Sequence, residues 1–198
     1  MSKLFNNDTI GKSPTLSGEY KKTLQAHHGS KVWGATAIKW AGPDVERILN
    51  EEHYHIETVL DYGCGQHTLA QRFPQVQWHG YDPGIPERAE KPTGTFDLVV
   101  CTDVMEHIEG EYIDAVLQEI MDYSTRVVFF EIACAPAFDK FLDGPHEGED
   151  VHVSVHPPKW WEDKIRALKG IHVQEVHALG KQTRGTWRDR VKFILEKL

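Results

Sequence analysis

The sequence has few cysteines and no long apolar run, which argues against a disulfide-stabilised protein and against a membrane-spanning protein. Three cysteines among 198 residues make a poor disulfide framework. No apolar run approaches the roughly 20 residues that a transmembrane helix requires. Residues 1–11 are polar and lack the apolar core of a secretion signal. We therefore predict a cytoplasmic protein that does not span a membrane.

Positive charge is also scarce outside the C-terminal end. The formal net charge of −8 argues against tight, non-specific binding to nucleic acid. Residues 180–198, however, hold six basic and two acidic side chains, a net charge of +4, so the other residues carry −12. The length and the hydrophobic content of 40% are those of one globular domain, of unknown oligomeric state.

A glycine turn lies at the centre of a strand–turn–helix pattern. A strand predicted over residues 57–61 is followed by Gly63 and Gly65 and then by a short helix over residues 67–73. The two glycines let the backbone turn sharply and approach a ligand closely. The next apolar segment ends at Asp82, the spacing at which a βαβ unit places an acid against a ribose.

Two residues discriminate between ribose-containing ligands. A dinucleotide fingerprint has a third glycine where this chain has Thr68, and it places a pyrophosphate on the turn. Asp61 would repel that pyrophosphate but would favour a ligand with an ammonium and a sulfonium. A nicotinamide-dependent oxidoreductase is therefore an alternative that both residues oppose.

Three motifs, in this order, resemble class I S-adenosylmethionine (SAM) dependent methyltransferases. They are Asp61-x-Gly63-x-Gly65, then Asp82, then residues 96–108 with their Met-Glu-His triplet. The resemblance extends over residues 59–132. It implies SAM as the cofactor and a single-domain enzyme, in which residues 1–55 form N-terminal helices and a cap and residues 56–198 form the SAM-binding core.

The resemblance also implies a set of cofactor-binding residues. Gly63 and Gly65 would let the backbone approach the methionine part of SAM, Asp61 would hold its ammonium, and Asp82 would accept the ribose hydroxyls. Further candidates for the cofactor cleft are Cys64, Cys101, Thr102 and Asp103, together with Pro83 and Ile85 as apolar contacts of the adenine ring. Asp103 has an alternative role as the cap of a helical turn over residues 104–108.

Apolar strands and helices alternate along the chain, which predicts an α/β fold with a doubly wound, mostly parallel sheet of the Rossmann-like type. Helices are predicted over residues 13–28, 43–52, 111–124 and 158–169. Further strands are predicted over residues 76–81, 96–101, 126–132, 171–179 and 186–198. By the resemblance, the last two form a C-terminal antiparallel hairpin. Three prolines between Asp82 and Phe96 rule out a full helix and strand, so the third strand of the resembled fold is shortened or missing.

Histidines are the candidates for catalysis on the acceptor side. His107 follows the predicted strand over residues 96–101, and His152 and His156 alternate with valines in a strand-like segment over residues 151–156. The alternative for each is a packed or hydrogen-bonded histidine with no part in a reaction. The acidic and histidine residues over 146–156 match no compact zinc spacing, so we predict no metal.

The predicted function is methyl transfer from SAM to a small acceptor, because the chain is short and has no added recognition domain. We expect the loop around Trp33, the turn over residues 103–107 and the segment with His152 to converge on the cofactor. Lys181 and Arg184 at the same rim would suit a phosphate-bearing acceptor. The remaining alternative is a SAM-fold binding or regulatory protein without turnover.

Overall fold

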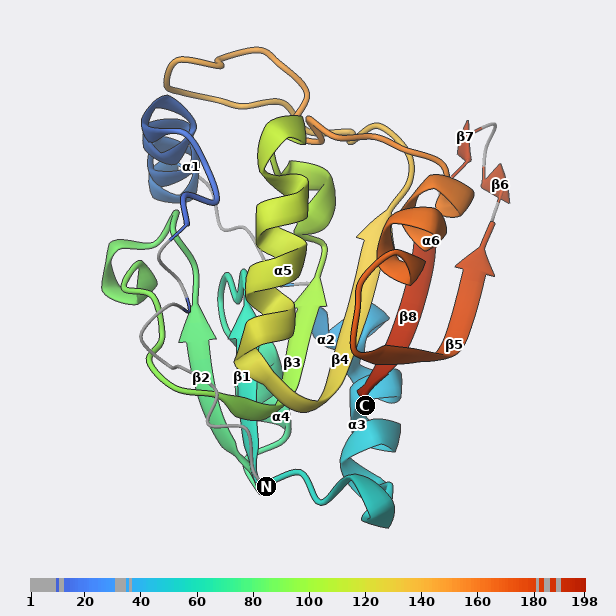
Figure 1. Cartoon of the computed structure of the whole chain (residues 1–198). Coiled ribbons are helices and arrows are strands. Elements are labelled where there is room, and N and C mark those ends of the chain that lie inside the picture. The colour runs from blue at the N-terminus through green and yellow to red at the C-terminus, as the bar shows by residue number, and fades with distance from the viewer. Residues whose placement is uncertain are drawn as a thin grey trace.

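The computed structural model describes residues 10, 13–30, 35, 37–180, 182–183, 186–187 and 190–198. Over these residues the chain forms a six-stranded sheet with the order β2-β1-β3-β4-β8-β5 (Figure 1). The strands are β1 (Thr58–Tyr62), β2 (Gln77–Tyr81), β3 (Phe96–Thr102), β4 (Ser124–Ala133), β5 (Ile171–Leu179) and β8 (Arg190–Lys197). The first four run parallel, and β8 is antiparallel to both β4 and β5. The predicted fold class is confirmed, including the antiparallel C-terminal hairpin.

The helices connect these strands or precede them. They are α1 (Gly18–Ser30), α2 (Ala37–Trp40), α3 (Gly42–Asn50), α4 (Thr68–Arg72), α5 (Ile113–Tyr123) and α6 (Pro158–Arg166), with the short turns η1 (Glu52–Tyr54), η2 (Pro86–Arg88), η3 (Met105–His107) and η4 (Gly110–Tyr112). Two short strands, β6 (Gln182–Thr183) and β7 (Thr186–Trp187), pair in the connection between β5 and β8. None of the described helices is long and apolar enough to cross a membrane.

Side chains of the sheet alternate between two apolar layers, one on each face. In β4, Val128 and Phe130 pack in the layer that contains the buried residues of α5 and α6. Val127 and Phe129 pack in the other layer, with α3 and α4. Figure 1 shows α5 and α6 in front of the sheet and α3 behind it. Since both faces are covered, the strand is a continuous apolar run rather than an alternation of polar and apolar residues.

The connection between β2 and β3 is as short as its prolines predict. Residues 83–95 are all described, and their regular structure is limited to η2. β2 is consequently the edge strand of the sheet. Because a proline has no backbone N–H to donate to a ladder, this segment cannot supply a further strand. The prediction of a missing third strand is confirmed.

The N-terminal helix is displaced from its predicted position over residues 13–28. α1 begins at Gly18, where the backbone N–H of Tyr20 donates to Ser17 Oγ at 3.0 Å. Ser17 therefore caps the helix, as its residue type predicts. Thr15 and Leu16, which precede the cap, line a cavity instead of extending the helix.

The strand predicted over residues 151–156 is wrong, because this segment is irregular and pairs with no strand of the described chain. Ser154 instead donates its N–H to the Glu106 carbonyl at 2.9 Å and its hydroxyl to the Ile108 carbonyl at 2.6 Å. These contacts with the η3 turn satisfy the backbone without a ladder. The alternation of valine and histidine is real, but it does not mark a sheet.

α1 and the loop of residues 134–157 form a roof above the carboxyl ends of the strands. Tyr20 of α1 packs with Phe141 and Val151 of the loop in a small apolar cluster, and the Tyr20 and Phe141 rings meet edge to face at 5.9 Å. In Figure 1 this loop passes over the top of the molecule beside α1. The roof closes the side of the sheet on which α/β proteins bind their ligands.

Candidate functional site

A cavity of about 450 Å³ lies between the carboxyl ends of the parallel strands and this roof. Its floor comes from the turns that follow β1, β2, β3 and β4, and its roof comes from α1 and from Val151 and His152. The volume is within the range of small-molecule sites. The floor residues used below are Asp61, Gly63, Cys64, Gly65, Asp82, Pro83, Thr102, Asp103 and His107.

The glycine turn after β1 is fixed to the end of β2. The N–H groups of Gly63 and Cys64 both donate to the Tyr81 carbonyl, at 2.7 and 3.0 Å. Gly63 has a φ of +75°, and a Cβ at this position would lie 2.3 Å from a methyl carbon of Val104. Both the backbone conformation and the space therefore require glycine here.

Asp82 connects the turn after β2 with the glycine turn. One carboxylate oxygen accepts the N–H of Gly65 at 3.0 Å, and the other accepts the N–H of Gly84 at 2.9 Å. His28 of α1 approaches the same carboxylate, with Nε2 3.8 Å from Oδ1. These contacts orient an acidic group at the cavity wall, where each oxygen has a second lone pair to offer a ligand.

Asp61 is a buried carboxyl group that lacks a hydrogen-bond donor among the described residues. Its side chain lines the cavity, and the nearest basic atom among those described is His67 Nε2, 3.9 Å from Oδ2. Burial first, and the charge of Asp82 second, raise the pKa of Asp61 to about 7, against an opposing effect of Arg88. A cationic ligand group would supply the missing partner.

Asp103 follows β3 and forms an ion pair with Arg190 at the start of β8. Its φ of +53° is left-handed, a conformation that aspartate tolerates better than most residues. The same Nη1 atom of Arg190 lies 3.2 Å from Glu131 Oε1. Burial, followed by the charge of Asp103, raises the pKa of Glu131 to about 7. Arg190 is thus held by two acids, of which Asp103 lines the cavity floor.

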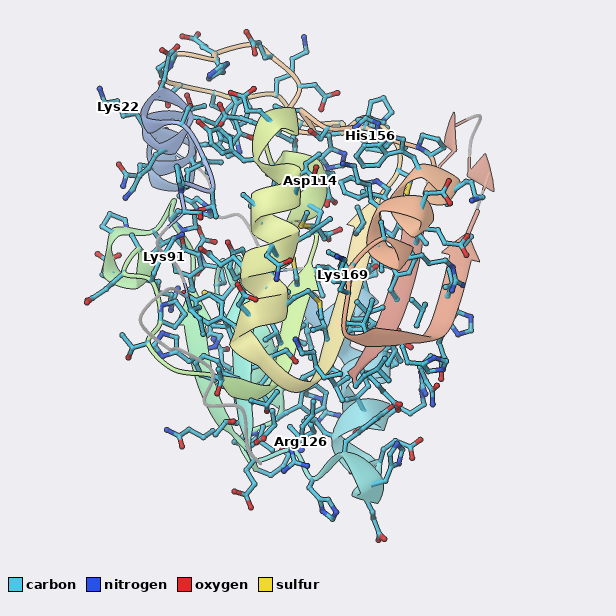
Figure 2. The ribbon with its side chains drawn as sticks, viewed as in Figure 1. Lys22, Lys91, Asp114, Arg126, His156 and Lys169 are labelled. Carbon is cyan, nitrogen blue, oxygen red and sulfur yellow. The ribbon has the colours of Figure 1, made fainter. Side chains whose placement is uncertain are left out.

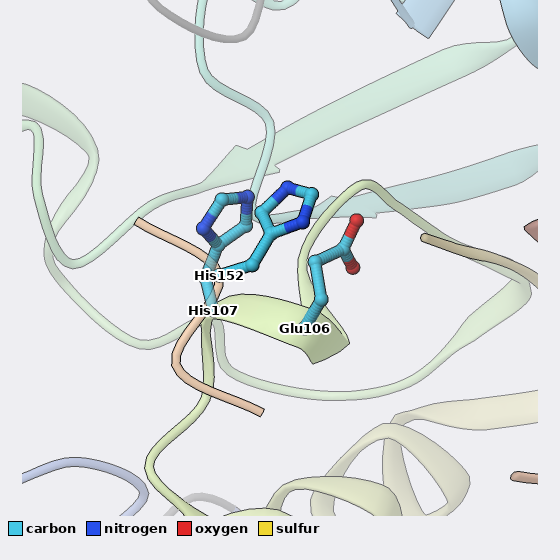
Figure 3. A group of neighbouring side chains, drawn as sticks. All are labelled: Glu106, His107 and His152. Carbon is cyan, nitrogen blue, oxygen red and sulfur yellow. The ribbon is translucent and has the colours of Figure 1, made fainter. Parts of the chain in front are cut away.

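Glu106, His107 and His152 form a third group, which Figure 3 shows with the two imidazoles beside each other and the carboxylate next to them. The ring centroids of the two histidines are 4.8 Å apart. Burial, followed by the charge of His152, lowers the pKa of His107 to about 3. Burial, followed by the charge of Asp103, raises the pKa of Glu106 well above its usual value. At neutral pH the His107 ring is therefore neutral.

The cavity brings together most of the residues that the sequence suggested and omits three. Cys101 is fully buried in the apolar layer beneath the cavity, and Ile85 does not line it. His156 stacks on Trp160 of α6, with ring centroids 3.7 Å apart, and also lies outside the lining (Figure 2). The expected contributions of Trp33, Lys181 and Arg184 fall outside the described residues.

Sequence reasoning missed four residues of this region. Glu106 stands next to His107 in the sequence, so its place in the Met-Glu-His triplet was a usable signal. Arg190 and His28 gave no comparable signal, because each reaches the cavity only through the packing of distant elements, and Glu131 joins this region only through its contact with Arg190.

Comparison with known families identifies the chain. The family model described as "Methyltransferase domain" matches residues 29–184. The chain belongs to this methyltransferase family. Membership of this family gives the chain SAM as its cofactor and SAM-dependent methylation as its chemistry. No curated protein sequence matches the chain significantly.

Solved methyltransferase structures share the fold at low sequence identity. The structure titled "DhpI-SAH complex structure" aligns with a TM-score of 0.59 and 12% identity, over 91% of this chain and 98% of that one. The small RNA methyltransferase HEN1 aligns with a TM-score of 0.55 and 14% identity, over 79% of this chain but 25% of that one. The N-methyltransferase NodS from Bradyrhizobium japonicum WM9, in complex with S-adenosyl-L-homocysteine (SAH), aligns with a TM-score of 0.50 and 10% identity, over 90% and 98% of the two chains. These similarities extend to the fold alone.

Proposed function

We propose that this methyltransferase binds SAM against the glycine turn, with Asp61 at the ammonium and Asp82 at the ribose, and methylates a small acceptor under the roof of the cavity. The observation that carries the proposal is the buried Asp61 carboxyl, which lines the cavity without a hydrogen-bond donor among the described residues. Such a group destabilises the empty protein when ionised and is stabilised by a cation.

The other floor residues suit the rest of this cofactor. Gly63, Cys64 and Gly65 carry no bulky side chain into the turn, so a ligand can lie directly on the backbone. Asp82 is already oriented by two backbone N–H groups, which leaves lone pairs for ribose hydroxyls. Pro83, Thr102 and Asp103 complete the proposed cofactor wall. Cys101 and Ile85 are left out because neither lines the cavity.

Bound SAM supplies a methyl group on a positively charged sulfur, which an acceptor displaces in line. Placement of the acceptor atom accounts for most of the rate in such a reaction. We propose His107 and His152 for the wall of the acceptor space, since both line the same cavity as Thr102 and Asp103. With a pKa of about 3, His107 is too weak a base to remove a proton from an acceptor at neutral pH. His156 has no place in this proposal.

The size of the acceptor follows from the space available. Cofactor and acceptor share about 450 Å³ beneath a roof that α1 and the loop close by apolar packing. A small molecule suits this volume better than a folded polymer. The prediction of a phosphate-bearing acceptor rested on Lys181 and Arg184, which lie outside the described residues. Phosphorylated and unphosphorylated acceptors are therefore tested separately.

The test begins with calorimetric titration of the protein with SAH and with NAD. We expect saturable binding of SAH and none of NAD; the reverse result would favour the oxidoreductase alternative. Methyl transfer from isotopically labelled SAM is then measured with pooled phosphorylated metabolites, pooled unphosphorylated metabolites and total RNA. Label in a small product supports the proposal. Label in RNA contradicts the assignment of a small acceptor. SAH binding without any labelled product contradicts the assignment of turnover.

A further inference from the structure

We propose that Glu106, His107 and His152 bind one divalent metal ion at the edge of the cavity, where the η3 turn meets the roof. Each residue offers one ligand atom, and these atoms all lie within 4.8 Å of one another. A tetrahedral ion with bonds of about 2.1 Å needs its ligand atoms roughly 3.4 Å apart. Small rotations of the side chains in Figure 3 would therefore bring the three ligand atoms to the separation that a bound ion requires.

The hydrogen bonds of the two histidines fix which nitrogen would bind the ion. His107 Nδ1 lies 2.7 Å from the Val151 carbonyl oxygen, and His152 Nδ1 lies 2.7 Å from the Ala135 carbonyl oxygen. A carbonyl oxygen only accepts, so each Nδ1 must carry the proton. In the neutral rings, Nε2 then has the lone pair. An Nδ1–H held by a backbone carbonyl is the arrangement that orients metal-binding histidines in other proteins.

The third ligand is a buried carboxylate oxygen that lacks a hydrogen-bond partner in the described part of the chain. Glu106 is fully buried, and its Oε1 accepts the N–H of Ala133 at 3.0 Å. Oε2 is buried and has no hydrogen-bond partner among the described residues. Buried carboxylate oxygens are almost always satisfied, because an unmet one costs the free energy of its lost hydration. A metal ion next to both imidazoles would satisfy this oxygen.

The charges around the group also favour a cation. Asp103 lines the cavity floor and shares Arg190 with Glu131, so among the described residues here two acids share one base. His27 and His28 of α1 lie near His107 on the roof side. Two nitrogens and one oxygen are ligands typical of Zn²⁺, Mn²⁺, Fe²⁺ or Co²⁺, whereas Mg²⁺ and Ca²⁺ prefer oxygen alone.

Three protein ligands leave coordination positions for a molecule in the cavity. Since His107 and His152 line that cavity, an oxygen or nitrogen atom of a bound molecule could occupy them. If this molecule is the methyl acceptor, which rests on the proposed function, the ion would hold its reacting atom beside the cofactor wall. The metal site itself does not depend on that step and is tested without methyl transfer.

The test is metal binding by the full chain after treatment with a chelator. The protein is dialysed against Zn²⁺, Mn²⁺ and Co²⁺ in turn, and the visible absorption of bound Co²⁺ reports nitrogen ligands. The site variants are Glu106→Gln, which keeps the acceptor for the Ala133 N–H, and His152→Asn, which keeps a donor at the position of Nδ1. The matched control is His172→Asn, because His172 is exposed on β5.

We expect one ion per chain and a melting temperature that rises with metal. Each site variant should weaken binding at least about tenfold and lose the rise in melting temperature, while the control should behave as the unaltered chain does. The proposal is overturned if none of the three ions binds saturably, or if both site variants keep the unaltered affinity. Circular dichroism of the metal-free variants shows whether a lost signal reflects lost folding; a folded variant without metal binding supports the site.

Discussion

The ionisation of Asp61 should control how tightly SAH binds. Its pKa of about 7 in the unliganded protein means that it is half protonated at neutral pH. The ammonium of SAH interacts favourably with the ionised carboxylate alone, so binding requires loss of that proton. Affinity should therefore level off near about pH 8, where the SAH amino group is still largely protonated, and fall about tenfold for each pH unit below about 7.

The size of the effect is large enough to measure directly. At about pH 5 close to one hundredth of the Asp61 carboxyl groups would be ionised, so the affinity should be nearly a hundredfold lower than at about pH 8, roughly 2.7 kcal/mol. Among the described residues, the charged and titratable groups near Asp61 are Asp82, Arg88, His67, Cys64 and Cys101. Isothermal titration calorimetry across this pH range measures the slope.

The variant Asp61→Asn distinguishes the titration of Asp61 from that of neighbouring groups, because asparagine has nearly the same shape as aspartate but does not titrate. The variant should bind SAH more weakly at about pH 8 and show a nearly flat profile. A flat profile in the unaltered protein, or an equal slope in the variant, would refute the placement of the ammonium at Asp61.

The same pKa predicts an effect on folding without ligand. The folded-state value of about 7 exceeds the usual 3.8, so the folded protein holds the Asp61 proton more tightly than the unfolded chain. Stability should fall as the pH rises from about 4 to 7, by up to roughly 4 kcal/mol relative to Asp61→Asn. Chemical denaturation of both proteins at the two ends of this window measures the difference, and equal stability changes would argue against a buried carboxyl.

Three further substitutions test the turn, the ribose acid and the core. Asp82→Ala should weaken SAH binding by roughly 1.5–3 kcal/mol, because it removes the ribose acceptor and frees two backbone N–H groups; calorimetry with unchanged affinity would place the ribose elsewhere. Leu117→Ala should lower the free energy of unfolding by roughly 2–5 kcal/mol, since this side chain is 1% exposed between α5 and the sheet; an unchanged denaturation midpoint would mean that α5 contributes little to the core. Gly63→Ala should destabilise the folded protein more than Gly94→Ala. Both glycines have a positive φ, but a Cβ would lie 2.3 Å from Val104 at position 63 and would meet open space at position 94. Equal losses in the free energy of unfolding would show that conformational strain alone, about 1–3 kcal/mol, decides both.

Several features of the fold follow from local rules and were therefore predictable. Continuous apolar runs such as β4 indicate strands covered on both faces, and the helical spacing of α5 indicates one apolar side. The prolines after Asp82 exclude another strand for a reason that acts within a few residues. Boundaries were less certain: α1 starts later than predicted, and β8 starts at Arg190 rather than at residue 186.

The proposed cofactor half of the site was equally predictable, because its parts lie at the ends of consecutive strands. Asp61, Gly63 and Asp82 are fixed relative to one another by a single βαβ unit, so their order and spacing already place them at one edge of the sheet. The structure added the hydrogen bonds that join Asp82 to the glycine turn. It also added the burial that raises the pKa of Asp61.

The acceptor half was decided by tertiary structure. The sequence by itself determined the sheet, the glycine turn and the two acids, since periodicity, backbone restriction and strand ends are local properties. It did not determine that His152 would meet Glu106 and His107 from an irregular loop. Nor did it determine that Arg190, on β8, would pair with Asp103, which follows β3 two strands away. These contacts join segments distant in the chain, and their geometry depends on how α1 and the loop of residues 134–157 pack together, which no local pattern specifies.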